Sequence, residues 1–160
     1  MTFPRILRTA GYRTKAVGKM HFTPTYLDVG FDELLLAEQD GPGRWDDDYH
    51  RYLMHQGLVD HNDLEDQLVN EYRKSARKEY WDACGAVVSN LPEEHHSTTW
   101  IANQAMEALR SWDNRSRQLL MVGFIKPHHP FDPPAPWHQM YDRAATDAAC
   151  ALSSPYLERF

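Results

Sequence analysis

Apolar and polar positions along the chain predict short helices and strands in alternation. Residues 2–11 are expected to form a short helix, because Pro4 suits a first helical turn and Gly11 is a natural stop. Residues 13–18 form a strand of modest hydrophobicity that ends at a glycine, and 31–36 is a second short strand. The segment between these strands has few periodic apolar positions, so we expect a loop there.

The strongest helical period lies at about 98–112, where apolar side chains recur at three- and four-residue spacing. These positions are Trp100, Ile101, Ala105, Ala108, Leu109 and Trp112. The apolar run 119–125 then predicts a strand that is buried on both faces. Three acids at 46–48 favour the start of another helix, which Gly57 would end. The alternation predicts an α/β fold with a mainly parallel sheet and flanking helices.

The composition is that of one globular domain and excludes several classes of protein. The chain has 160 residues, of which 42% are hydrophobic and 25% are charged. No run of about 18 apolar residues is present, so no membrane span is predicted. A net charge of −6 argues against nucleic acid as a partner. The N-terminal residues lack the layout of a signal peptide, which by default predicts a cytoplasmic location.

Cationic side chains follow two of the predicted strands directly. The strand at 13–18 and the strand at 119–125 each run into a segment that contains lysine and histidine. Ligands bind beyond the carboxyl ends of the strands in open parallel sheets, so these side chains are expected to converge at one edge. The residues are Lys19, His21, Lys126, His128 and His129. Such a group of side chains suits a small tetrahedral anion.

Each of these features also has an ordinary structural explanation. A Lys-x-His sequence at a strand end can be a solvated loop, and a histidine next to prolines can hydrogen-bond a rigid turn. The acids at 46–48 point in different directions from a helix start, so we expect them to cap the helix rather than bind a metal. The histidines at 95–96 are expected to be solvated, and Cys84 is expected to be a partly buried structural thiol.

Aromatic and methionine side chains are expected to fill the core. The candidates are Tyr49, Tyr52, Met54, Trp100, Met106 and Trp112. Phe131, Trp137 and His138 follow the second cationic loop, where they either line a substrate pocket or anchor an ordinary loop.

Two stretches of the chain resemble motifs of the sulfatase family. Residues 7–22 contain G-Y-x-T-x-x-x-G-K-x-H, which is similar to the second signature of that family. Residues 123–134 resemble the family's later PHxP motif at a strand end. The resemblance assigns residues 1–142 to the central part of a sulfatase N-terminal catalytic domain and leaves 143–160 as an unassigned tail.

Sulfatases belong to the alkaline phosphatase superfamily, so the resemblance implies part of its α/β sandwich. The family hydrolyses sulfate esters, here a small molecule or a sulfated glycan, with calcium or magnesium and a formylglycine made from Cys or Ser. By the motif match, Lys19 would bind the sulfate and the formylglycine oxygen. His21 would hydrogen-bond the formylglycine diol and act as a base, and His128 would contact the sulfate and act as general acid. Lys126 and His129 flank the same site as further substrate-binding candidates.

The chain also departs from the family pattern. The family's nucleophile lies in C-x-[PA]-S-R upstream of the G-K-x-H motif, and neither Cys84 nor Cys150 fits that pattern. The family's metal ligands lie outside the matched stretches, so no metal ligand is expected in this chain. We therefore expect a sulfatase fragment that is inactive and weakly stable alone. Two alternatives remain, a phosphonate or phosphate monoesterase of the same superfamily and a non-catalytic, truncated sulfatase-like protein.

Overall fold

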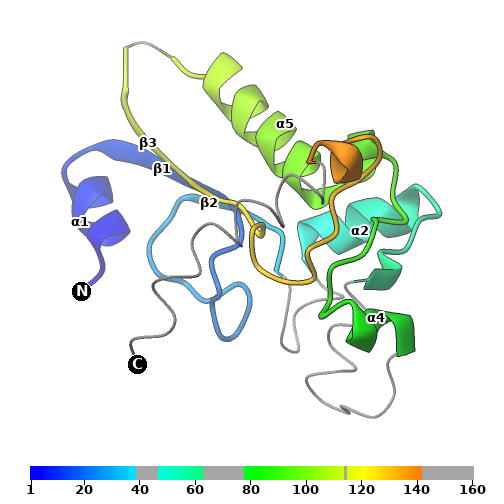
Figure 1. The fold of residues 1–160 in the computed structure, drawn as a ribbon. Coiled ribbons are helices and arrows are strands. Elements are labelled where there is room, and N and C mark those ends of the chain that lie inside the picture. Colours follow the sequence, from blue (N-terminus) through cyan, green and yellow to red (C-terminus); the bar gives the residue numbers. More distant parts are fainter. Residues whose placement is uncertain (39–46, 63–77, 114, 142–160) are drawn as a thin grey trace, which may run out of the picture.

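A parallel sheet with helices packed beside it organises the computed structural model, which describes residues 1–38, 47–62, 78–113 and 115–141 (Figure 1). The elements in chain order are α1 (Phe3–Thr9), β1 (Tyr12–Gly18), β2 (Glu33–Leu36), α2 (Asp48–His55), α4 (Lys78–Asp82), the 3-10 helix η1 (Glu93–His95), α5 (Ser97–Arg110), β3 (Arg117–Gly123) and the 3-10 helix η2 (Trp137–Gln139). The predicted α/β class and parallel sheet are confirmed. The tail predicted at 143–160 lies outside the described residues.

The described strands lie in the order β2-β1-β3, and both pairings of β1 are parallel. Gly18 is in register with Leu36 on one side and with Gly123 on the other. Strands β1, β2 and β3 therefore end at one edge of the sheet. Helix α5 runs along one side of the sheet, and α1 lies on the other side (Figure 1).

The core lies between α5, α2 and the sheet. Its buried side chains are Val17, Ala37, Tyr49, Leu53, Leu91, Trp100, Ile101 and Ile125. The rings of Tyr49 and Trp100 pack with centroids 5.4 Å apart, which links α2 to α5. Helix α5 buries Trp100, Ile101, Ala105 and Ala108 as the three- and four-residue spacing predicts, whereas Leu109 of the same predicted stripe is 45% exposed.

Local sequence signals set the ends of α2. The Asp47 side chain accepts a hydrogen bond from the backbone N–H of His50 at 2.7 Å and so caps the helix. Gly57 follows the helix with φ of 70°, a conformation that costs little only for glycine. The predicted capping role of the acidic run is confirmed for Asp47, whereas Asp46 lies outside the described residues.

Several expectations about burial are wrong. Strand β3 is not buried on both faces, because Met121 and Val122 are 40% and 37% exposed. Among the described residues β3 pairs with β1 alone, and α5 covers only part of it. Met54 and Met106 are exposed rather than in the core, because each lies on the outer face of its helix. Cys84 is exposed in a turn with φ of 52°, not partly buried.

No helix among the described residues combines the length and the apolar character needed to cross a membrane.

Candidate functional site

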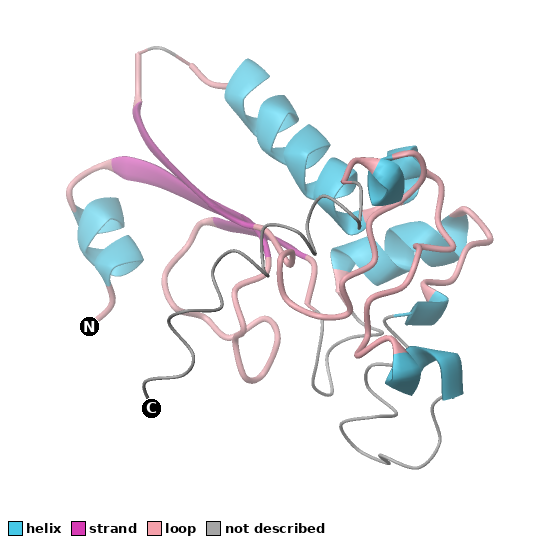
Figure 2. Cartoon of the chain, in the orientation of Figure 1, coloured by secondary structure: helices cyan, strands magenta, loops and turns pink. Residues whose placement is uncertain are grey.

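The two motif loops are joined where they leave the sheet. The backbone N–H of Lys19 donates to the carbonyl of Gly123 at 2.7 Å. Gly18 has φ of 95°, and a Cβ at this position would overlap the Gly123 carbonyl oxygen. Two glycines therefore allow the ends of β1 and β3 to approach closely, so both loops start from one edge of the sheet (Figure 2). The structure thus brings the starts of the two loops together.

His21 is held by a buried carboxylate that the sequence interpretation missed. Glu38 is 2% exposed, and its Oε1 accepts hydrogen bonds from the backbone N–H groups of Met20 and His21, both at 3.0 Å. Its Oε2 also lies 3.0 Å from the His21 nitrogen. His21 has φ of 58°, a left-handed conformation that is unfavourable for a residue with a Cβ. Glu38 therefore fixes the backbone that carries the His21 imidazole.

Glu38 is itself fixed by the start of α2. Its backbone N–H donates to Asp47 Oδ2 at 2.7 Å, and Asp47 Oδ1 lies 2.8 Å from Nδ1 of the buried His50. Burial raises the pKa of Glu38, although the Met20 and His21 backbone N–H groups and the charge of His21 oppose this effect. The only sign of this contact in the sequence is that a glutamate directly follows the apolar residues 34–37.

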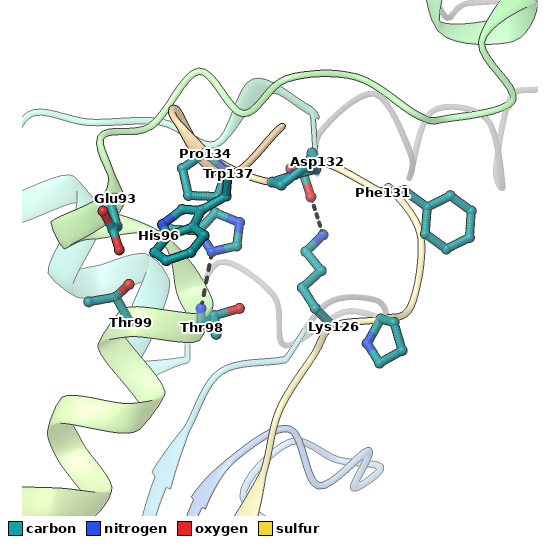
Figure 3. A pocket seen from close by; sticks show the side chains of 11 residues that line it. Glu93, His96, Thr98, Thr99, Lys126, Phe131, Asp132, Pro134 and Trp137 are labelled. Atoms are coloured by element: carbon teal, nitrogen blue, oxygen red, sulfur yellow. Dashed lines mark hydrogen bonds and ion pairs between the residues drawn. The ribbon is translucent and has the colours of Figure 1, made fainter. Parts of the chain in front are cut away.

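Lys126 folds back over its own loop. Its Nζ donates to the carbonyl of Pro130 at 2.6 Å and forms an ion pair with Asp132, which is 1% exposed (Figure 3). This side chain therefore closes the loop that contains His128 and His129. The structure assigns Lys126 a contact inside the protein, and its predicted contact with substrate stays a prediction.

His128 lies at the exposed tip of this loop. Its Nδ1 is 2.7 Å from the His129 carbonyl oxygen, and the centroids of the two rings are 4.3 Å apart. A carbonyl only accepts, so Nδ1 carries the proton in the neutral ring and Nε2 has the lone pair. His128 can therefore accept a proton at Nε2, or donate one from Nε2 when the ring is protonated.

A pocket of about 480 Å³ opens beside the loop after β3, at the N-terminal end of α5 (Figure 3). Its lining consists of Glu93, His96, Thr98, Thr99, Lys126, Pro127, Phe131, Asp132, Pro133, Pro134 and Trp137. Phe131 and Trp137 thus line a pocket, as one of the two sequence interpretations had it, whereas His138 is not part of the lining in the described residues.

The expectation that His96 is solvated is wrong. This side chain is 3% exposed, and its Nδ1 accepts from the backbone N–H of Thr98 at 3.3 Å at the start of α5. Burial, together with the charge of Lys126, lowers the pKa of His96 to about 4. Burial raises the pKa of Asp132 to about 6, against the opposing effect of Lys126. Neither position carries a sequence signal, because burial depends on distant segments.

Asp132 and His96 are expected to give opposite pH dependences of stability. Between about pH 4 and 6 folded Asp132 keeps a proton that the unfolded chain releases, so its contribution to the free energy of unfolding falls as pH rises. Unfolded His96 binds a proton between about pH 4 and 6.5 that the folded protein excludes, so its contribution rises with pH. Each change is about 3 kcal/mol, and in the wild type the two changes oppose each other.

Urea unfolding at intervals from pH 4 to 7 tests this expectation. Relative to wild type, Asp132→Asn should gain stability as pH rises, because only His96 remains. His96→Asn, which can still cap α5, should lose stability over the same range. Slopes of the same sign in the two variants would contradict the assignment.

No group of three or more His, Cys, Asp or Glu side chains within the described ranges is arranged to hold a metal ion. Cys84 is exposed in a turn, and the residues that follow it do not form a nucleophile motif. The described residues therefore do not fit a metal or a formylglycine.

The chain is similar in sequence to known proteins. A family model described as Sulfatase matches residues 1–153. A protein named Arylsulfatase from Clostridium perfringens (strain 13 / Type A) is 28% identical over 142 residues, which are 82% of this chain and 28% of that protein. The chain therefore spans 28% of the length of this curated relative.

Proposed function

The chain belongs to the sulfatase family, and on that basis we propose that it supplies the sulfate-binding and acid–base part of a sulfuric ester hydrolase. Sulfatases act on sulfate esters and generally use a formylglycine and a divalent metal ion. The observation that carries the proposal is the joined edge of β1 and β3, where the hydrogen bond from Lys19 to Gly123 brings together the loops of both motifs.

Each proposed role follows from the chemistry of a side chain at this edge. The Lys19 ammonium group binds a sulfate oxygen as a compact positive charge. The protonated His128 ring donates from Nε2 to the oxygen of the leaving alcohol, so that this alcohol departs neutral. His21 supplies a second imidazole, which acts as a base. The left-handed backbone that Glu38 holds fixes the position of this ring. Lys126 and His129 complete the surroundings of the anion.

We further propose that the nucleophile and the metal ligands belong to a longer catalytic domain of which this chain is one part. The support is the match to only 28% of the relative's length, together with the absence of C-x-[PA]-S-R from the printed sequence. A catalyst without its nucleophile loses most of its rate.

The test compares the 160-residue chain with the complete polypeptide encoded by its reading frame, using phenyl sulfate and phenyl phosphate as substrates. The complete polypeptide should prefer the sulfate ester by about tenfold or more in kcat/KM, and the isolated chain should turn over neither ester. A preference for phosphate would instead support a phosphate monoesterase. Inactivity of a folded complete polypeptide would support a non-catalytic protein, and turnover by the isolated chain would disprove the proposed division of the site.

A further inference from the structure

The loop after β3 that carries the proposed acid is anchored at both ends. At its start, Ile125 is buried, and its carbonyl accepts from the backbone N–H of His128 at 3.1 Å. At its end, the backbone N–H of Phe131 donates to the carbonyl of Gly85 at 2.8 Å. The carbonyl of Phe131 in turn accepts from the backbone N–H of Val87 at 3.1 Å. His128 therefore lies between two fixed points of the fold.

One side chain ties these two ends together. Lys126 lies at the start of the loop, and its Nζ donates to the carbonyl of the buried Pro130 at 2.6 Å. The same Nζ forms an ion pair with Asp132 at the end of the loop (Figure 3). The Lys126 side chain is 20% exposed and the carboxylate of Asp132 is fully buried. Water and salt screen such a pair much less than an ion pair on the surface, so it can hold the loop closed.

Asp132 belongs to a part of the fold that is held independently of Lys126. The side-chain amide nitrogen of Asn62 lies 3.5 Å from Asp132 Oδ2 and donates to the carbonyl of Val88 at 3.0 Å. The carbonyl of the next residue, Pro133, accepts from the backbone N–H of Ser89 at 3.2 Å. Asp132 is therefore a fixed counter-ion, and it determines where the Lys126 ammonium group lies.

The position of the His128 ring depends on the shape of this loop. Its backbone N–H bonds to Ile125, its Nδ1 lies 2.7 Å from the carbonyl oxygen of His129, and its ring packs on the His129 ring. All of these contacts are made within the loop itself. A change in the shape of the loop therefore moves the imidazole.

We propose that Lys126 and Asp132 are a positioning pair for the proposed acid, because their ion pair closes the loop 126–132 and holds the His128 imidazole where it meets the leaving oxygen. The proposal rests on the proposed function for the reaction, and on the contacts above for the role of the pair in the loop. In this role neither side chain touches the reacting atoms.

The first test compares two esters that differ in their need for an acid. Phenyl sulfate releases a basic phenolate, which a proton stabilises as it leaves, whereas 4-nitrophenyl sulfate releases a stable anion. In the complete polypeptide at about pH 7.5, Lys126→Met and Asp132→Asn should each lower kcat/KM for phenyl sulfate at least about tenfold. The same variants should lower kcat/KM for 4-nitrophenyl sulfate less than about threefold. Lys126→Arg, which keeps the positive charge, should recover part of the loss.

Two results would overturn the positioning role. Equal falls for the two esters would show general damage rather than loss of the acid. A lysine that bound the sulfate itself would act without Asp132, so Lys126→Met would slow both esters. Asp132→Asn, which removes a negative charge, would then leave both rates unchanged or raise them.

A double variant and a matched control complete this test. Lys126→Met/Asp132→Asn leaves no unpaired buried charge, and it should cost about as much as either single variant because one interaction is lost in all three. A double loss equal to the product of the single losses would contradict a pair. Lys15 is 26% exposed and is paired with Glu33 at 3.2 Å on β1, away from the loop. Lys15→Met should leave both kcat/KM values unchanged, and a fall as large as that of Lys126→Met would overturn the proposal.

The second test needs no turnover and uses NMR to follow hydrogen exchange of backbone N–H groups in the 160-residue chain. Lys126→Met should speed exchange of the His128 N–H about tenfold. It should leave the Trp100 N–H, which donates to the carbonyl of His96 at 2.9 Å in α5, unchanged. Unchanged exchange at His128, or equal acceleration at both residues, would overturn the role of the pair in the loop. If neither ester is hydrolysed while exchange at His128 responds as expected, the proposed function fails and the role of the pair in the loop stands.

Discussion

Replacing Glu38 with alanine should lower kcat of the active polypeptide about a hundredfold, because a displacement of about 1 Å in a catalytic group is enough for such a loss. The variant leaves the N–H groups of Met20 and His21 without their buried acceptor. The left-handed backbone of His21 then loses the hydrogen bonds from Glu38 that hold it, and the imidazole moves from its working position. Steady-state kinetics at a temperature where both proteins are fully folded provide the measurement.

Two further variants separate positioning from a general loss of stability. Glu38→Gln keeps one oxygen that can accept from both N–H groups, so it should recover part of kcat. Asp47→Asn perturbs the same buried network where it meets Glu38 and His50 but does not contact the loop after β1. It should lower the unfolding temperature more than kcat. If Asp47→Asn and Glu38→Ala reduce kcat equally at equal loss of stability, Glu38 does not position His21.

Gly18→Ala is expected to destabilise the fold by at least about 3 kcal/mol. A left-handed alanine is strained, and its Cβ would overlap the Gly123 carbonyl oxygen at the closest approach of β1 and β3. Relief of this overlap breaks the hydrogen bond from Lys19 to Gly123 at the edge where β1 and β3 end. Urea unfolding measures the loss, which should shift the midpoint without changing the m-value.

Gly57→Ala is the matched control for this substitution. Gly57 also has a positive φ, of 70°, but nothing lies within 4 Å of a Cβ built there. Only the backbone strain remains, and the expected cost is about 1 to 2 kcal/mol. Equal losses of unfolding free energy in the two variants would show that the close contact between Gly18 and Gly123 adds nothing to the cost of the substitution. The close approach of β1 and β3 would then not explain why position 18 is a glycine.

The sequence by itself determined helices α1, α2 and α5, the strands and the place of the motif loops, but not α4 or the 3-10 helices η1 and η2. Pro4 and Gly11 bound the first helix through local backbone preferences, and the Asp47 cap acts on the adjacent turn. The period of apolar residues at 98–112 likewise reflects one face of one helix. These features depend on residues a few positions apart, so the order of residues is sufficient to predict them.

Only the tertiary structure decided how the candidate site is supported. Glu38 meets the His21 N–H across 17 residues, and Asn62 lies 3.5 Å from Asp132 across 70. The exposure of β3 and the burial of His96 depend on which segments cover them. Contacts between distant residues are set by the path of the whole chain and leave no periodic signal, so the sequence predicted where His21 and His128 lie but not what holds them.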